Sequence, residues 1–342
     1  MKENIQGKEK KLNFKPGSIS EQVYKLSFEQ NKTDDEVAKV IGKEIKDVKY
    51  YKRQIELRLE KLNKPKVVET QTTITQNQEM NKFIPLTNGY IKRRLHGIND
   101  VDILKTAYTN KDFVLIVGET GTGKTHLIRH FAYENKLPYA RINLNGGTTA
   151  DELIGHWVPN KDGGFKWQDG ILTTFVKNGG VIALDEVNAC PAEILFCLHS
   201  LTDDERTLTL VDENNTVIKA HPNFFLVATM NPDYEGTKPL NQAFKDRFKI
   251  KLIFDYDDKI EKKIVEDEVI VELAKKLRTM HSKGEISTPI STRTLIHYSE
   301  NKNAYGEKLA FEIFLNNFET DEKDAIKNVM ELMKSNENTD GE

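Results

Sequence analysis

Short apolar runs recur through the middle of the chain and alternate with segments whose apolar residues have helical spacing. The runs cover residues 113–117, 139–144, 181–184, 224–229 and 250–254. Continuous apolar runs of this length are typical of parallel strands that are buried on both faces by helices. The pattern therefore predicts an α/β domain in which helices cover both faces of a parallel sheet.

Helical patterns flank this domain on both sides. From residue 256 the chain is charged, with apolar positions such as Ile260, Ile264, Leu273 and Leu277 at near-helical spacing. We expect a small all-α N-terminal domain, a polar Thr/Gln-rich linker, the α/β domain, and a C-terminal helical lid with an acidic tail. The bounds predicted for these four parts are 1–66, 67–82, 83–255 and 256–342.

Composition narrows the class of protein only slightly. The 342 residues are 30% charged with a formal net charge of −3 at pH 7, which favours no class of partner. No apolar run approaches the roughly 20 residues that span a bilayer, and the N-terminus lacks a signal-peptide pattern. We therefore expect a cytoplasmic protein without membrane contact. The only two cysteines, Cys190 and Cys197, share one predicted helix face, which favours packing over metal binding or a disulfide.

A glycine-rich turn follows the first apolar run and leads into a helical segment. It fits the pattern G-x-x-x-x-G-K-[ST], which binds phosphates in this strand–turn–helix context. Its residues are Gly118, Glu119, Thr120, Gly121, Thr122, Gly123, Lys124 and Thr125. The glycines let successive N–H groups point at one spot, where the following helix adds its positive end. Lys124 would reach the β- and γ-phosphates and the Thr125 hydroxyl would ligate Mg²⁺, so the sequence predicts a site for ATP and Mg²⁺.

Polar residues end two further apolar runs. Asp185 and Glu186 follow the run at 181–184, and Asn231 follows the run at 224–229. A carboxylate at the end of a buried strand can hold Mg²⁺ through water, which is the role expected of Asp185, and Glu186 is placed to polarise the attacking water. Asn231 would hydrogen-bond that water or the γ-phosphate. The alternative for Asp185 and Glu186 is a surface turn, and the alternative for Asn231 is a turn that the Asn-Pro pair initiates. The phosphate-binding motif upstream disfavours both.

Two arginines complete the candidate site. Arg247 precedes the last apolar run, where it is a poor candidate for its own site but could reach a neighbour's as an arginine finger. The alternative for Arg247 is a surface pair with Asp246. Arg293 opens a predicted C-terminal helix and could close over the phosphates from the lid, the alternative being an ordinary surface-helix arginine.

The N-terminal 66 residues are basic, with 17 Lys and Arg against 11 Asp and Glu. Thr33 followed by Glu36 predicts a capping box at the start of a short helix, and Gly42 supplies the turn to a second helix that packs back through Val48. This resembles a helix-turn-helix, whose second helix would lie in a DNA major groove. Phosphate contacts are then expected from Lys46, Lys49, Lys52 and Arg53. The alternative is a helical domain that docks a protein and keeps a solvated basic face.

Across residues 83–300 the order and spacing of these elements resemble an AAA+ ATPase. The Walker A and Walker B motifs, sensor 1, the arginine finger and sensor 2 match Gly118–Thr125, Asp185-Glu186, Asn231, Arg247 and Arg293 in that order. The likeness is closest to the MoxR-like branch, which includes CbbQ/NirQ-type activators and the CobS-type cobaltochelatase subunit. Further matching phrases lie at residues 141–144, 151–155, 169–172, 184–188 and 291–293. The resemblance implies an ATP-hydrolysing enzyme that assembles with itself into a homo-hexameric ring.

Two predicted hairpins support that branch. Residues 155–167 form aromatic-bearing arms around Asp162-Gly163, and residues 207–219 form a second hairpin. In the family such hairpins line the pore or upper surface of the hexamer, so the aromatic residues of the first either grip a polymer or partner, or only pack the hairpin. These residues are Trp157, Phe165 and Trp167. The basic N-terminal module departs from compact MoxR-like proteins, which puts their usual partner, a von Willebrand factor A-type protein, in doubt here.

Two functions follow. The first is a ring-forming ATPase that remodels an unknown protein or nucleic-acid client. The alternative is a DNA-binding protein whose residues 1–66 grip duplex DNA and whose ATP-dependent assembly acts as a switch in replication, partition or regulation.

Overall fold

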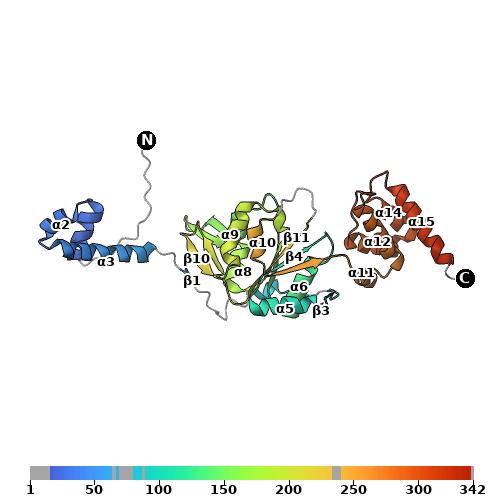
Figure 1. Cartoon of the computed structure of the whole chain (residues 1–342), viewed down its shortest axis with the longest axis horizontal. Helices are drawn as coiled ribbons and strands as arrows, with labels where there is room; N and C mark the ends of the chain where they lie inside the picture. Colours follow the sequence, from blue (N-terminus) through green and yellow to red (C-terminus); the bar gives the residue numbers. More distant parts are fainter. Residues whose placement is uncertain (1–15, 64–66, 69–79, 87–88, 233–239, 340–342) are drawn as a thin grey trace. The chain divides into compact units, whose positions relative to one another are not determined.

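The computed structural model describes residues 16–63, 67–68, 80–86, 89–232 and 240–339. The chain forms two compact units, Met1–Lys66 and Val67–Glu342 (Figure 1). Most of the linker expected over residues 67–82 and the end of the expected acidic tail lie outside the described residues.

Helices make up the described part of the first unit. They are α1 (Ile19–Tyr24), a π-helical turn η1 (Lys25–Glu29), α2 (Asp34–Ile41) and the long α3 (Ile45–Asn63). The predicted capping box is present, because Thr33 Oγ1 accepts from the N–H of Glu36 and the Glu36 carboxylate accepts from the N–H of Thr33. Gly42 ends α2 at φ +64°, a conformation that glycine adopts without strain. Apolar residues of α1, α2 and α3 form a small core of Val23, Val37, Ala38, Val48 and Ile55.

A five-stranded parallel sheet forms the centre of the second unit. Its strands are β4 (Val114–Gly118), β5 (Tyr139–Asn143), β8 (Gly180–Asp185), β11 (Phe224–Met230) and β12 (Ile250–Phe254). Their spatial order is β12-β4-β11-β8-β5, and every neighbouring pair is parallel. The predicted parallel sheet is confirmed, and each of the five apolar runs supplies one strand. The carboxyl ends of β4, β8 and β11 therefore meet at one edge.

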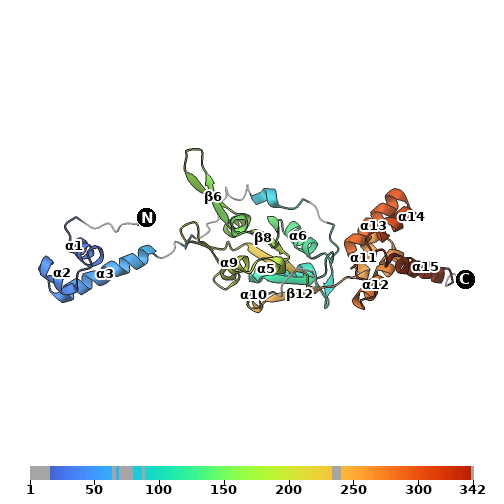
Figure 2. The same cartoon turned by 90° about the horizontal axis from the view of Figure 1, so that it is seen from above.

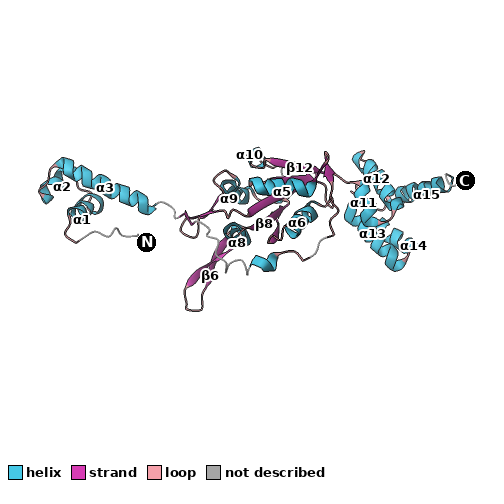
Figure 3. Ribbon diagram, turned by 90° about the horizontal axis from the view of Figure 1, so that it is seen from below, coloured by secondary structure: helices cyan, strands magenta, loops and turns pink. Residues whose placement is uncertain are grey.

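Alternate strand residues face two different helical layers. Val114 and Ile116 of β4 pack with α5 and α6, whereas Leu115 packs in the core that contains α8, α9 and α10. Figure 3 labels these helices around the sheet. These helices are α5 (Asp100–Asn110), α6 (Lys124–Glu134), α8 (Ile171–Asn178), α9 (Ala192–Thr202) and α10 (Gln242–Asp246). Both faces of the sheet centre are thus covered, which is why β4, β8 and β11 are buried almost throughout. The edge strands β5 and β12 alternate instead and carry the exposed residues Arg141 and Lys251.

Both predicted hairpins are present. The first, β6 (Gly155–Pro159) with β7 (Phe165–Asp169), projects from the domain, and the second pairs β9 (Thr207–Leu210) with β10 (Thr216–Lys219) (Figure 2). The first hairpin lies between the short helix α7 (Ala150–Leu153) and α8. The remaining short elements are β1 (Val67–Val68), η2 (Asn81–Phe83), β2 (Arg94–Leu95), β3 (Ile98–Asn99) and η3 (Val187–Ala189).

The aromatic residues of the first hairpin divide between packing and exposure. Trp167 is half-buried against the sheet core and donates to Asp169, so it packs the base of the hairpin. Trp157 contacts the Trp167 ring edge-on and donates from Nε1 to the carbonyl of Asp212 at 3.1 Å, which ties the two hairpins together. Phe165 is 69% exposed. Packing therefore explains Trp167 fully, Trp157 in part, and Phe165 not at all.

The C-terminal part is helical, as expected. Its helices are α11 (Asp258–Val265), α12 (Glu268–Ser282), α13 (Thr292–Tyr305), α14 (Glu307–Leu315) and α15 (Lys323–Thr339). They share a core of their own, which includes Leu273, Leu277, Leu295, Phe314 and Ile326. Within the described ranges, none of the helices combines the length and apolar character required to cross a bilayer.

Candidate active site

The glycine-rich turn connects the end of β4 to the start of α6. Gly121 and Gly123 have φ of +81° and +90°, which favour glycine. Gly123 precedes α6 without offering a side-chain cap, so the first N–H groups of the helix favour an anion together with the helix dipole. The turn begins at Gly118, where an added Cβ would lie 2.1 Å from the carbonyl oxygen of Phe254 in β12. The paired strand therefore permits only glycine at this position.

Lys124 is enclosed by oxygen atoms. Only 7% of its surface is exposed, and Nζ donates to the carbonyls of Gly118 at 2.7 Å and Glu119 at 2.8 Å and to Asn231 Oδ1 at 2.7 Å. Burial lowers the pKa of Lys124 to about 8, although Asp185, Glu119 and Glu186 act in the opposite direction. The loop thus holds a partly desolvated cation whose charged form gains from any anion brought beside it.

Asp185 lies at the end of β8 and is 2% exposed. Its carboxylate accepts from Thr125 Oγ1 at 2.9 Å, from Thr229 Oγ1 at 2.8 Å and from Arg141 Nε at 2.5 Å. These three donors offset the cost of burying the charge. A hydroxyl and a carboxylate stand side by side in Thr125 and Asp185, and both are oxygen ligands of the kind that Mg²⁺ prefers.

Glu186 has an unusual backbone. Its φ of +59° and ψ of +45° lie in the left-handed region, which is uncommon outside glycine and concentrates at functional sites. The side chain is half-buried, and within the described residues it makes no hydrogen bond or ion pair. The turn thus leaves a carboxylate unengaged immediately after Asp185.

Asn231 joins the end of β11 to the phosphate-binding loop. Its Oδ1 accepts from Lys124, its Nδ2 donates to Thr120 Oγ1 at 3.1 Å, and its backbone carbonyl accepts from Asn188 Nδ2 at 2.7 Å. The carboxyl ends of β4, β8 and β11 therefore bring Lys124, Asp185 and Asn231 together, although they come from well-separated parts of the sequence.

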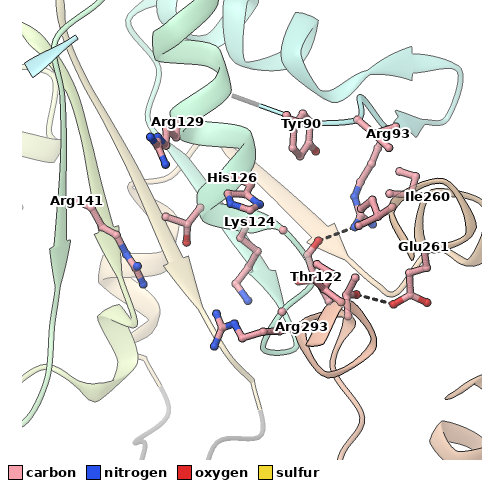
Figure 4. A pocket seen from close by; sticks show the side chains of 18 of the residues that line it. Tyr90, Arg93, Thr122, Lys124, His126, Arg129, Arg141, Ile260, Glu261 and Arg293 are labelled. Carbon is pink, nitrogen blue, oxygen red and sulfur yellow. Dashed lines mark hydrogen bonds between the residues drawn. The ribbon is translucent and has the colours of Figure 1, made fainter. Parts of the chain in front are cut away.

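A cavity of about 610 Å³ opens beside Lys124, within the usual size of a small-molecule site (Figure 4). Its cationic side chains include Arg129, Arg141 and Arg293, the last from the start of α13. Burial lowers the pKa of His126, and these three arginines lower it further, which reports a positive potential in the cavity. The apolar wall is formed by side chains that include Tyr90, Ile91, Ile260, Ile264 and Ile296.

Arg247 is not among the residues that line the cavity. Its Nε lies 2.8 Å from Asp203 Oδ1 at the end of α9, and its Nη1 donates to the carbonyl of Ala243 at 2.7 Å. Asp246, the alternative partner from the sequence, lies 3.7 Å from Lys251 instead. The structure thus gathers Lys124, Thr125, Asp185, Asn231 and Arg293 and leaves Arg247 outside.

Three residues of this site were not predicted from the sequence. Arg141 and Thr229 bind Asp185, and Arg93, 8% exposed, donates to the carbonyls of Thr122 at 2.6 Å and Asp255 at 2.8 Å. A charged residue inside a predicted buried strand was an available signal for Arg141. No local pattern marks Arg93 or Thr229, because their partners are distant in the sequence.

The residues present fit a nucleoside triphosphate with Mg²⁺. A positive cavity and the N–H groups at the start of α6 suit phosphates, an apolar wall suits a flat base, and the Thr125–Asp185 pair suits Mg²⁺. With a parallel sheet whose carboxyl edge carries these groups, the fold and site define a P-loop nucleoside triphosphatase.

Comparison with known proteins makes the class more specific. The AAA domain of the dynein-related subfamily matches residues 113–248. Protein CbbQ of Hydrogenophilus thermoluteolus is 34% identical over 62% of this chain and 84% of its own length. The denitrification regulatory protein NirQ of Stutzerimonas stutzeri is 32% identical over 58% of this chain and 74% of its own, and protein NorQ of Paracoccus denitrificans is 32% identical over 58% and 76%. The chain belongs to this family and is an AAA+ ATPase of the CbbQ, NirQ and NorQ type.

Proposed function

We propose that copies of this ATPase assemble into a ring, a homo-hexamer, that uses ATP hydrolysis to remodel a protein or nucleic-acid client. The observation that carries the proposal is the place of Arg247. It pairs with Asp203 away from the cavity that Lys124 and Arg293 line. A guanidinium held outside its own site is suited to the site of a neighbouring copy, where it would stabilise transition-state charge.

Within one site, residues of the phosphate-binding loop and of the lid would bind the phosphates. Lys124 and the loop N–H groups would hold the β- and γ-phosphates, and Arg293 would contact the γ-phosphate from α13. Thr125 and Asp185 would hold Mg²⁺, whose charge offsets the negative charge that develops on the phosphate oxygens.

Hydrolysis requires a positioned water. The unengaged carboxylate of Glu186 would accept a hydrogen bond from it and polarise it. Asn231 would orient the same water or the γ-phosphate, because its amide is fixed by Lys124 and Thr120. Positioning and charge compensation suffice for this reaction, since phosphoryl transfer asks little covalent chemistry of the protein.

A Glu186→Gln substitution tests the assignment of the base. We expect ATP affinity to stay within about twofold while turnover falls by about 10²–10⁴-fold, the usual contribution of a positioned base. Nucleotide-binding fluorescence and phosphate release measure the two quantities. Glu193→Gln, which changes an exposed acid on α9 in the same way, is the matched control. Undiminished turnover in Glu186→Gln would remove Glu186 from this role.

Subunit mixing tests the shared site. Lys124→Ala and Arg247→Ala chains are each expected to be inactive, and mixing them should restore part of the activity because some sites then combine an intact loop with an intact finger. The control mixes Lys124→Ala with Lys249→Ala, which removes an exposed cation paired with Asp112 and leaves the finger intact. It gives the ATPase activity expected when Lys124→Ala is diluted with a chain that is itself active. If the first mixture stays inactive while the control mixture is active, Arg247 does not act between copies.

The client is expected at the exposed hairpin. Phe165 is 69% exposed and Trp157 is 44% exposed on the projecting β6–β7 hairpin, an arrangement that supports contact with another molecule. The Glu186→Gln chain, which should keep ATP and its client, is the suitable bait, and a Phe165→Ala version should capture less. Equal capture by both chains would place the client elsewhere.

A second candidate function is DNA binding through the first unit. The capped α2, the left-handed turn at Gly42 and the long α3 support it, because a helix that enters a DNA groove must follow a short turn from the helix before it. On α3, however, Lys46, Lys52 and Arg53 lie 2.6, 3.1 and 3.4 Å from carboxylates, so phosphates would have to displace these partners. A gel shift with the full chain across a salt series tests it: affinity should fall steeply with salt and drop in Lys49→Ala. No binding at low salt would favour a protein-docking role.

A further inference from the structure

A buried carboxylate in the lid, at the wall of the cavity, joins three helices. Glu261 of α11 is 1% exposed and accepts two hydrogen bonds from Arg278 of α12, both at 2.7 Å. The same carboxylate accepts from Thr292 Oγ1 at 2.5 Å, at the first residue of α13. A two-pronged pair of this kind fixes geometry as well as charge. The start of α13, which carries Arg293, is therefore fixed to α11 and α12.

The Arg278 side chain makes contacts beyond its pair with Glu261. Its Nε donates to the carbonyl of Ile290 at 2.9 Å, just before α13, and its guanidinium stacks 3.6 Å from the ring centroid of Tyr256. Tyr256 follows β12, and its hydroxyl donates to the carbonyl of Thr120 at 2.8 Å. A continuous path of contacts thus runs from the phosphate-binding loop through Tyr256, Arg278 and Glu261 to Thr292.

The loop and the lid also touch directly. An added Cβ on Gly121 would lie 2.9 Å from Cβ of Ser291, the residue that caps α13. The lid helix therefore packs directly against the loop, and the path through Tyr256 and Arg278 holds it in that register.

We propose that Tyr256 and Arg278 are positioning residues of the ATPase site, which connect the phosphate-binding loop to α13 and so hold Arg293 at the γ-phosphate position. The proposal rests on the proposed role of Arg293. Because the Arg293 side chain makes no hydrogen bond or ion pair within the described residues, its place over the cavity depends on how the start of α13 is held. The affinity for ATP, which has a γ-phosphate, should therefore depend on this path of contacts, whereas the affinity for ADP should not.

Tyr256→Phe tests the path with little risk to the fold, since it removes one hydroxyl. We expect the affinity of the full chain for ATP to fall about three- to tenfold, as for the loss of one hydrogen bond, and ADP affinity to change less than twofold. Tyr298→Phe, the same change in the lid core, is the matched control and should alter neither. A fluorescent nucleotide displaced by ATP or ADP measures both affinities in hydrolysis-deficient Glu186→Gln chains.

Arg278 is tested with its partner, because Arg278→Met alone would leave Glu261 buried and unpaired. The pair Glu261→Gln with Arg278→Met should fold, as thermal unfolding would show, and should lose ATP affinity at least as much as Tyr256→Phe.

A double-mutant cycle separates positioning from general structure. If Tyr256 acts through Arg293, adding Tyr256→Phe to Arg293→Ala should cause less than a further twofold loss of ATP affinity. Fully additive losses, or equal losses for ATP and ADP, would overturn the proposal. An Arg293→Ala chain that binds ATP normally would also overturn it while leaving the ATPase site intact, whereas normal ATP binding by Lys124→Ala would refute the proposed site itself.

Discussion

From the lowered pKa of Lys124 we predict that nucleotide affinity falls between pH 7 and pH 9, where an ordinary lysine stays charged. With a pKa of about 8, the side chain is charged below that pH and loses its proton as the pH rises through it. The charged fraction falls from about 0.9 at pH 7 to about 0.1 at pH 9. Because phosphates should bind the charged form, apparent affinity scales with this fraction and should fall about tenfold. A free lysine, with its pKa near 10.4, would leave affinity almost flat over the same range.

A titration with a fluorescent ATP analogue in Glu186→Gln chains between pH 7 and pH 9 measures this effect. Lys124→Arg is the matched control, since its guanidinium stays charged throughout and its affinity, whatever its level, should not follow the same curve. The nucleotide-free chain supplies a second readout. An unfolded lysine holds its proton up to about pH 10.4, so the Lys124 contribution to stability should rise with pH between about 8 and 10. Flat affinity in the parent chain, or the same slope in Lys124→Arg, would refute the argument.

Three further substitutions have outcomes fixed by the described contacts. Arg93→Met removes two charge-assisted hydrogen bonds that hold the phosphate-binding loop and the segment after β12, and should cost about 2–4 kcal/mol in thermal or urea unfolding; a loss below about 0.5 kcal/mol would contradict this. Gly118→Ala should prevent stable folding, because the new Cβ would lie 2.1 Å from the carbonyl oxygen of Phe254; a native circular dichroism spectrum and melting temperature would be the contrary result. Hydrogen bonds to the Glu322 carboxylate outweigh burial and lower its pKa from 4.5 to about 2, so its stabilisation is present above pH 4.5 and lost as pH falls to 2. Glu322→Gln should therefore cost about 2 kcal/mol near neutral pH, after discounting for solvent screening, and flatten the acid limb of the stability curve, and an unchanged limb would argue against it.

Much of the fold follows from short-range sequence patterns. The five apolar runs became the five strands, and the capping box at Thr33 and the turn at Gly42 formed as expected. Each of these features is decided within a few residues, by side-chain periodicity, by a cap that reaches three positions along, or by a glycine that tolerates positive φ. The same holds for the strand–turn–helix around Gly118–Thr125.

The partners of the candidate residues could not be predicted from the sequence. The motif gave Asp185 a role but not its partners, since Arg141 and Thr229 are both 44 positions away. Arg247 had an adjacent acid in the sequence, yet pairs with Asp203, also 44 positions away. Neighbours in a chain compete with every group that folding brings near, and the sequence alone does not rank those distant groups.

The sequence by itself determined that this chain is an α/β ATPase with a phosphate-binding loop, because strand, loop and helix propensities act locally. Tertiary structure alone decided that Tyr256, 136 positions from Thr120, touches the loop and that Arg278 connects it to the lid. Such contacts depend on how strands and helices pack, and packing is a property of the whole domain. The path of contacts between loop and lid therefore follows from the tertiary structure and from no local sequence pattern.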